Sequence, residues 1–300
     1  MFAERMDQAR AAMARQGLDA GLLSVGADLP YFTGYEAMPL ERLTMLVLPR
    51  DGDATLLIPE LEAPRVVERP EVFSLLPWGE TQDPIAMVAD LLGRASTAAI
   101  GDQTWSRFTV DLLAAMPQLT LRRASEVTSP IRAVKSDDEV ARLRTAAEAV
   151  DRIAARLQQG DIRLVGQTEA AVSAELGRQI IDEGHHRVNF AIVAAGENAA
   201  SPHHHAGGRI IRENEVVLCD FGGTWIGDDG VGYCSDITRC VWTGAAVAAE
   251  FAELYEVLFT AQAAQVRVAA SGAVPQEVDA TGRDIITQAG YGRYFVHRLS

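Results

Sequence analysis

Cysteine is scarce in this sequence, and its pattern argues against two common classes of site. Only three cysteines occur among 300 residues, Cys219, Cys234 and Cys240, and no two of them have the Cys-x-x-Cys spacing. A zinc or redox site built on cysteine pairs is therefore not expected. The odd number predicts packed, unbridged thiols in a reducing compartment.

Basic residues and long apolar runs are also in short supply. The chain has 27 Lys and Arg against 41 Asp and Glu, which gives a formal net charge of -14. This charge opposes non-specific binding to nucleic acid or to an anionic membrane surface. No apolar run approaches the ~20 residues of a membrane span, and residues 1–7 lack the apolar region of a signal peptide. We therefore expect a soluble, cytoplasmic protein that binds neither nucleic acid nor a membrane.

The sequence does contain enough apolar material for two domains. Hydrophobic residues make up 48% of the 300 positions, and this length favours two cores. Residues 1–130 alternate helix-like and strand-like segments, which predicts an α/β domain. Residues 131–300 combine long amphipathic helices with strand candidates. This second pattern predicts an α+β domain in which helices cover an antiparallel sheet.

The segments expected in the first domain follow from hydrophobic periodicity and from breaker residues. Helices are expected at residues 2–16, 85–94 and 108–116, and strands at residues 20–25, 43–48, 54–58, 97–101 and 119–122. Four aromatic side chains of this domain have two interpretations, packing in the core or lining of a substrate channel. They are Tyr31, Tyr35, Trp78 and Trp105.

The boundary between the domains is marked by Ser129-Pro130, which we expect to break the preceding strand. Ser136 and Glu139 have the spacing of a capping box and predict the start of a long helix that ends at Gly160. Further helices are expected at residues 168–183, 245–270 and 274–289, and strands at residues 188–195, 215–222, 232–241 and 294–300.

Two aspartates are the most informative residues of the second domain. Asp220 ends the apolar run that starts at Val216, and Asp236 interrupts the run from Gly232 to Arg239. An unpaired buried carboxylate would be costly in such a run, so a metal ion or a hydrogen-bonding partner is needed to offset the cost. The simpler alternative is that Asp220 caps a turn and that Asp236 pairs with Arg239. The occurrence of both carboxylates on successive strands favours a site for divalent metal ions.

These segments resemble the creatinase, aminopeptidase P and prolidase family. The similarity covers residues 5–25 and 28–35, the junction at residues 131–136, both aspartate-bearing strands and the end of the chain. It implies a pita-bread catalytic domain preceded by an α/β creatinase-type domain. It also implies two divalent metal ions (Mn, Co or Zn) held by two Asp, one His and two Glu. Asp220 and Asp236 match the two Asp positions.

Histidines supply the other candidate site residues. His203, His204 and His205 follow Pro202, and by residue type alone they predict a solvated loop or an adventitious metal binder. The resemblance implies that His203 contacts the substrate and that His297 is a second substrate-facing His. A hydrogen-bonded core position is the alternative for His297. His204 and His205 gain no role from the resemblance.

The resemblance also implies that the remaining metal ligands, one His and two Glu, lie beyond Ser300. The family's ligand His follows just after the position of Ser300, and both ligand Glu would lie beyond it, so we expect a fragment without peptidase activity of its own. The complete protein is expected to cleave peptides or dipeptides with proline at the second position, as a homodimer, with a Glu outside these residues as general base. Two alternatives stay open: a metal-free, creatinase-like hydrolase of C–N bonds, and a non-catalytic pita-bread binding protein.

The connection between the two aspartates is longer than the family pattern, and Trp225 to Gly230 is the apparent insertion. Asp-Gly is a turn signal, so the flanking strands are expected to pair in spite of the longer loop. Asp228 and Asp229 in this loop are alternative carboxylates, with a solvated loop as the simpler interpretation. Next to the second aspartate, Thr238 is expected to hydrogen bond an Asp and Arg239 to pair with a carboxylate.

Overall fold

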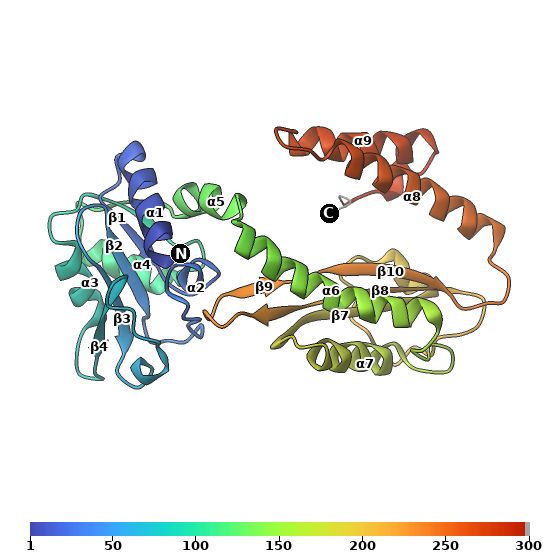
Figure 1. The fold of residues 1–300 in the computed structure, drawn as a ribbon, viewed down its shortest axis with the longest axis horizontal. Coiled ribbons are helices and arrows are strands. Elements are labelled where there is room, and N and C mark those ends of the chain that lie inside the picture. Colours follow the sequence, from blue (N-terminus) through green and yellow to red (C-terminus); the bar gives the residue numbers. More distant parts are fainter. Residues whose placement is uncertain (298–300) are drawn as a thin grey trace. The chain divides into compact units, whose positions relative to one another are not determined.

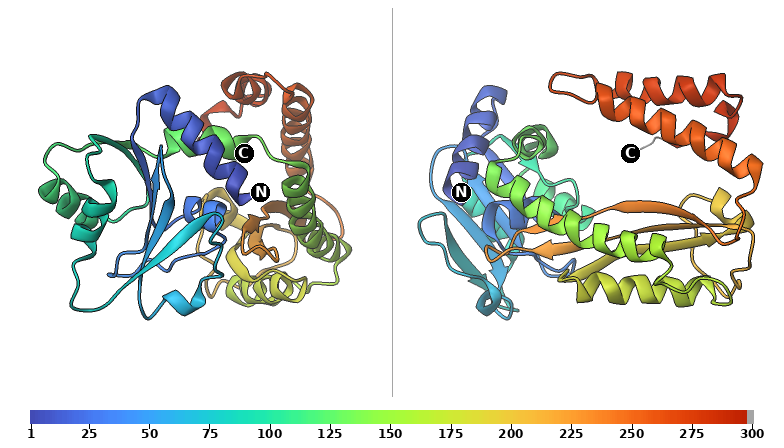
Figure 2. Two further views of the ribbon diagram at one scale, coloured as in Figure 1. Left: turned by 60° about the vertical axis from the view of Figure 1, so that its left-hand side comes forward. Right: turned by 45° about the vertical axis from the view of Figure 1, so that its right-hand side comes forward.

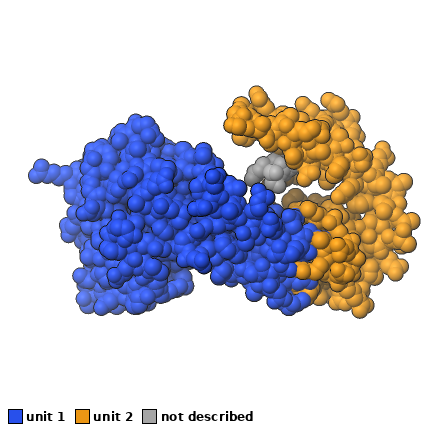
Figure 3. Space-filling view, in the orientation of Figure 1, with its two compact units in different colours: residues 1–154, 176–190, 221–237 blue, residues 155–175, 191–220, 238–300 orange. Residues whose placement is uncertain are grey.

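Residues 1–297 are described by the computed structural model, and their contacts divide the chain into two compact units (Figure 3). The first unit comprises residues 1–154, 176–190 and 221–237, and the second comprises residues 155–175, 191–220 and those from 238 onward. Two helices and three strands contribute residues to both units. The domain boundary between residues 130 and 131 remains a prediction.

A six-stranded mixed sheet lies at the centre of the N-terminal region (Figure 1). Its strands are β1 Ala20–Leu23, β2 Met45–Pro49, β3 Ala54–Pro59, β4 Phe73–Trp78, β5 Thr97–Ile100 and β6 Thr120–Arg123. Their order is β4-β3-β2-β1-β5-β6. Strand β2 pairs antiparallel with β1 and with β3, whereas the pairs β1–β5, β3–β4 and β5–β6 are parallel. This arrangement confirms the α/β prediction and adds β4, which was not expected.

Helices cover both faces of this sheet, as the left view of Figure 2 shows for α1 in dark blue and for α3 and α4 in teal. The helices are α1 Phe2–Gln16, α2 Asp28–Thr33, α3 Pro84–Leu92, α4 Ser106–Ala115 and α5 Ser125–Ala133. Adjacent residues of β1 point to opposite faces, as a strand requires. Leu23 packs in the core with α1, α2 and α5, and Leu22 packs in the core with α3 and α4. The sheet therefore has two buried faces.

Helix α1 is confirmed at its predicted bounds, and it ends where glycine allows a left-handed turn. Gly17 has φ 68°, and its N–H donates to Ala14 O at 3.3 Å.

Helix α5 overturns the expected break at Ser129-Pro130, because Pro130 lies inside a helix and not after a strand. A proline cannot donate to the carbonyl four residues before it, which here is that of Glu126. Gln16 Nε2 donates to Glu126 O at 3.0 Å instead. The tertiary contact supplies the missing hydrogen bond, so the helix continues through the proline.

The second half of the chain combines helices with a four-stranded sheet in which β10, β8 and β7 are neighbours and β9 pairs antiparallel with β8. Its elements are α6 Asp137–Gln159, α7 Glu169–Asp182, β7 Arg187–Ala195, β8 Val216–Ile226, β9 Gly232–Cys234, β10 Ile237–Trp242, α8 Ala249–Val268 and α9 Pro275–Gln288. Helix α7 packs on β7, where Ser173 Oγ donates to Ala191 O at 2.5 Å. These elements confirm the predicted α+β arrangement.

Two details of this half differ from the prediction. The strand expected at residues 232–241 is two strands, β9 and β10, separated by Ser235 and Asp236. The strand expected at residues 294–300 is wrong in its described part, because Gly292–Tyr294 is a 3-10 helix and residues 295–297 form no strand. Residues 298–300 lie outside the described residues. Within residues 1–297, none of the helices combines the length and the apolar character that crossing a membrane requires.

Glu139 joins helix α6 to helix α1 through one buried carboxylate. Its Oε2 accepts from Ser136 N at 2.8 Å, and its own N–H donates to Ser136 Oγ at 3.3 Å, so the predicted capping box is confirmed. Its Oε1 accepts from Arg5 Nη2 at 2.8 Å. The two charged side chains are 5% and 9% exposed. Arg5 also donates to Tyr31 O at 2.7 Å, so the ion pair connects α1, α2 and the start of α6.

Replacing Glu139 by alanine is expected to lower the free energy of unfolding by about 3–5 kcal/mol, because it leaves the buried Arg5 without its counter-charge and uncaps α6. Urea denaturation followed by circular dichroism measures this loss. Glu148→Ala, at an exposed position of α6, is the matched control and should change stability by no more than about 0.5 kcal/mol. Equal stability of the two variants would contradict the role assigned to Glu139.

Candidate metal and substrate site

Asp220 lies within β8, on the face of the strand opposite its buried residues. Val217, Cys219 and Phe221 are fully buried, whereas Asp220 is half-buried. Its Oδ1 accepts a hydrogen bond of 2.7 Å from Thr238 Oγ1 in β10. The expected hydrogen bond from Thr238 to an Asp is confirmed, and the alternative in which Asp220 caps a turn is wrong because the residue is in mid-strand.

Asp236 lies in the short break between β9 and β10, and it is exposed. The residue before it, Ser235, is tied to β8 by two hydrogen bonds: Ser235 N donates to Gly223 O at 2.9 Å, and Gly223 N donates to Ser235 Oγ at 3.2 Å. Arg239, in β10, donates to Thr238 O at 2.8 Å. The break therefore has a defined backbone position, although it is not part of a regular strand.

His185, in the turn after α7, also contacts this break. It is 3% exposed, and its Nε2 lies 2.9 Å from Ser235 Oγ. Burial lowers the pKa of His185, because a charged imidazolium loses its hydration there. The ring is therefore neutral, and its Nε2 forms one hydrogen bond with Ser235 Oγ. No motif surrounds His185 in the sequence, and the sequence analysis missed it.

Two glycines allow the backbone of β8 to approach this break. A Cβ atom on Gly222 would lie 2.1 Å from Ser235 O and 3.2 Å from Asp236 Cα. A Cβ atom on Gly223 would lie 2.6 Å from Arg187 O and 2.9 Å from the His185 ring. Neither position tolerates a side chain, so Gly222 and Gly223 are required for close approach and not for an unusual φ.

The insertion at residues 225–230 supplies the end of β8 and most of the turn that follows it, and β8 and β9 pair as expected, with Ile226 opposite Gly232. Asp229 Oδ1 accepts from Val231 N at 3.1 Å, and its Oδ2 forms an ion pair of 2.5 Å with Arg142 of α6. This pairing favours a structural role for Asp229, whose side chain is only 11% exposed, so the expected solvated loop is wrong for this residue. Asp228 is exposed.

His203 and His297 lie side by side in the second unit. Their ring centroids are 6.2 Å apart with an interplanar angle of 77°, and both side chains are exposed. His203 has φ 57°, a left-handed conformation that is uncommon for a residue with a side chain. Such outliers gather at functional sites. The strand expected around His297 is absent, but the two imidazoles that the resemblance singled out do meet.

The loop that carries His203 is bound to a buried carboxylate that the sequence analysis missed. Glu169, the first residue of α7, is 1% exposed. Its Oε1 accepts from Ala195 N at 2.8 Å and from Asn198 Nδ2 at 2.9 Å, and its Oε2 lies 2.9 Å from His204 Nε2. Burial by itself would raise the pKa of Glu169, but these hydrogen bonds together hold it below its ordinary value.

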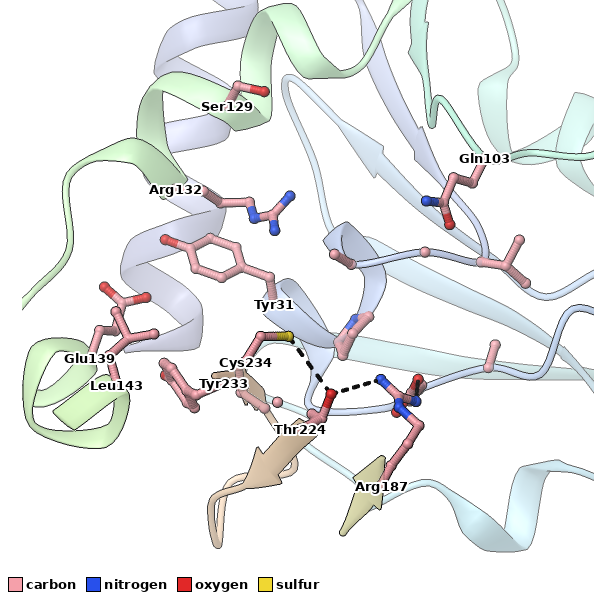
Figure 4. A pocket seen from close by; sticks show the side chains of 18 of the residues that line it. Tyr31, Gln103, Ser129, Arg132, Glu139, Leu143, Arg187, Thr224, Tyr233 and Cys234 are labelled. Atoms are coloured by element: carbon pink, nitrogen blue, oxygen red, sulfur yellow. Dashed lines mark hydrogen bonds and ion pairs between the residues drawn. The ribbon is translucent and has the colours of Figure 1, made fainter. Parts of the chain in front are cut away.

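A cavity of about 920 Å³ lies within the first unit (Figure 4). Its lining includes Tyr31, Arg132, Arg187 and Cys234, and Thr224 Oγ1 hydrogen bonds to the last two. None of the four predicted site residues lines it. Two of its charged side chains are already paired: Arg187 forms an ion pair of 2.7 Å with a glutamate, and Arg132 forms one of 2.9 Å with an aspartate.

Of the four aromatic residues with two interpretations, Tyr31 and Trp105 line this cavity. Tyr35 and Trp78 belong to the core, and Trp78 Nε1 donates to Leu43 O at 2.9 Å. The expectation for the three cysteines is confirmed in that none forms a disulfide, but Cys234 is exposed and not packed.

The two aspartates match the donor chemistry of a metal site but supply only part of it. Carboxylate oxygens suit hard and borderline divalent ions. The hydrogen bond from Thr238 to Asp220 is the kind of contact that orients a ligand carboxylate. Among the 297 described residues, no group of three or more His, Cys, Asp and Glu is placed to hold a metal ion. A complete ligand set therefore needs donors in addition to these.

Gly222→Ala is expected to lower the free energy of unfolding by about 1–3 kcal/mol, because the new methyl group would overlap a backbone oxygen that cannot rotate away. Gly208→Ala is the matched control, since a Cβ atom there meets nothing within 4 Å. Thermal denaturation of both variants checks the difference. A Gly222→Ala protein as stable as the control would show that β8 and the break do not approach as closely as described.

Two family models match this sequence. The model of metallopeptidase family M24 matches residues 141–300, and that of the creatinase/prolidase N-terminal domain matches residues 5–134. Among curated proteins, a probable dipeptidase PepE of Mycobacterium tuberculosis is 35% identical, over 99% of this chain and 78% of that protein.

Solved structures give the same result. Dipeptidase PepE from Mycobacterium ulcerans has a TM-score of 0.89 and 35% identity, over 99% of this chain and 79% of that one. A recombinant prolidase from Thermococcus sibiricus has a TM-score of 0.89 and 31% identity, over 99% and 80%. The expected resemblance and the expected fold are thereby confirmed. This chain belongs to metallopeptidase family M24, with a creatinase/prolidase N-terminal domain in front of its pita-bread peptidase domain.

Proposed function

We propose that the complete protein hydrolyses Xaa-Pro peptide bonds, as a dipeptidase or an aminopeptidase, with Asp220 and Asp236 among the ligands of two divalent metal ions. One observation carries the proposal: two residues after Asp220, the backbone of Gly222 lies against Ser235 O and the Cα of Asp236. Relatives named as a dipeptidase and a prolidase support the peptide substrate. Proline at the second position rests on the family resemblance.

The residues of this chain have distinct tasks in the proposal. Thr238 donates to Asp220 Oδ1 and holds that carboxylate in one orientation. His185 and the two glycines hold Ser235, and with it the backbone from which Asp236 projects. When bound, the metal ions supply Lewis acidity toward the scissile carbonyl and toward water. Binding of the ions also offsets the repulsion between carboxylates of like charge.

His203 and His297 are the substrate-contacting residues of the proposal. An imidazole N–H can donate to the scissile carbonyl oxygen, and the negative charge that develops on this oxygen strengthens the bond in the transition state. Both rings are exposed and lie 6.2 Å apart by their centroids, which leaves each of them accessible to a peptide. We also propose a homodimer, a Glu outside the described residues as general base, and Mn, Co or Zn as the metal.

Asp220→Asn and Asp236→Asn are each expected to lower kcat/KM for an Xaa-Pro dipeptide by more than about 100-fold, which exceeds the usual cost of losing a residue that only orients a ligand. Thr238→Ala should cost about 10- to 100-fold in metal affinity, with recovery in Thr238→Ser, which keeps the hydroxyl. Titration of Mn or Co into the full-length protein, followed by an assay of Xaa-Pro cleavage, measures both effects.

Asp228→Asn is the matched control, since this carboxylate is exposed in the insertion loop, and it should leave activity unchanged. A metal-free preparation with full activity would rule out the proposal in favour of the creatinase-like alternative. A protein that binds peptide but hydrolyses none with any divalent metal would favour the binding protein.

A polypeptide of the 300 residues alone is expected to bind Mn or Co weakly and to show no Xaa-Pro turnover, because its described residues offer no group of three ligands. Isothermal titration calorimetry and a peptidase assay on the same sample measure the two properties. Stoichiometric, tight binding of two ions by this polypeptide would contradict the prediction, because it would show that the 300 residues contain a complete set of ligands.

A further inference from the structure

We infer that the buried Glu169 and the half-buried His204 form a pair that positions His203 for the substrate. The inference rests on the proposed function, since it gives these two residues a task in the same reaction. Neither of them is a catalytic residue here, because each acts through the backbone of the loop at residues 196–207. Glu169 lies outside this loop, at the start of α7.

Glu169 bonds to both ends of the loop. At the loop's beginning, its Oε1 accepts from Ala195 N at 2.8 Å and from Asn198 Nδ2 at 2.9 Å. At the loop's end, its Oε2 meets His204 Nε2 at 2.9 Å and lies 3.5 Å from Gly207 N. A carboxylate has no proton to give, so the His204 Nε2 must carry hydrogen and donate it. The buried carboxylate of Glu169 thus connects the beginning of the loop to its end.

The chain after the loop reinforces this closure. Glu169 N donates to Arg209 O, and Ala170 N donates to Gly207 O, both at 3.0 Å, so the first N–H groups of α7 are satisfied by the same segment. Arg209 forms ion pairs with Glu215 at 2.7 Å and with Glu197 at 2.9 Å. The hydrogen bonds from Arg209 lower the pKa of Glu197 to about 2, so this pairing persists across the neutral range.

His203 is the residue whose position depends on this closure. It immediately precedes His204, and its φ of 57° is a conformation that the chain does not adopt unless the neighbouring residues are held. Its ring faces His297. Release of His204 from Glu169 would remove the side-chain hydrogen bond that fixes the residue next to His203, and His203 could then relax to the ordinary region of φ. Misplacement of about 1 Å can cost 100-fold in rate.

The test combines hydrogen exchange with kinetics in the full-length, metal-loaded protein. Glu169→Gln and His204→Ala are expected to speed exchange in the peptide covering residues 196–207 by about tenfold or more, as expected for a loop that opens locally. Both should lower kcat by about 10- to 100-fold with little change in KM. His204→Gln, which returns an N–H donor, should recover most of both losses. His205→Gln, at an exposed neighbouring position, is the control and should change neither.

A double-mutant cycle separates positioning from simple destabilisation. In a His203→Ala protein, the further change Glu169→Gln should cost almost nothing in kcat, because its effect passes through the ring already removed. Additive losses, or unchanged exchange at residues 196–207, would overturn the positioning role while the proposed function stands. No turnover by the wild-type protein with any divalent metal would overturn the proposed function, and the positioning role with it.

Discussion

The candidate site depends on one steric constraint, the contact between the backbone of β8 and the break between β9 and β10. Gly222 and Gly223 lie so close to Ser235 and to the His185 ring that no Cβ atom fits at either position. The contact is made rigid by the hydrogen bonds between Gly223 and Ser235. Asp220 and Asp236 flank it in sequence. Asp220 in β8 and Asp236 in the break are thereby carried by backbone that cannot slide.

Buried polar groups perform the same task at three junctions of this protein. Glu139 joins the cap of α6 to Arg5 of α1, Glu169 joins the start of α7 to the loop with His203, and His185 joins the turn after α7 to Ser235. Each group would be costly without its partners, since a buried polar atom that loses its hydrogen bonds keeps its desolvation penalty. These side-chain hydrogen bonds lie at loops and helix caps, where regular secondary structure leaves backbone groups without partners.

Local patterns predicted much of the fold because the forces behind them are local. Helix α1 ends at Gly17, and the capping box of Ser136 and Glu139 opens α6, as each pattern requires. The two aspartates were also singled out from the sequence pattern, and the family resemblance singled out the two histidines that are proposed to contact the substrate. Patterns failed where a distant partner overrides the local preference. Gln16 supplies the hydrogen bond that lets α5 continue through Pro130, which the dipeptide alone could not reveal.

The sequence by itself determined the identity of the candidate ligands, the two-part architecture and the amphipathic faces of the helices, because these follow from residue type and spacing. Only the tertiary structure decided that Ser235 and Asp236 interrupt a strand, that His203 and His297 meet, and that Glu169 and His185 hold their neighbours in place. The physical reason is burial. A carboxylate or an imidazole has the same identity in any sequence window, but its partners come from residues far along the chain, and only folding brings them within hydrogen-bonding distance.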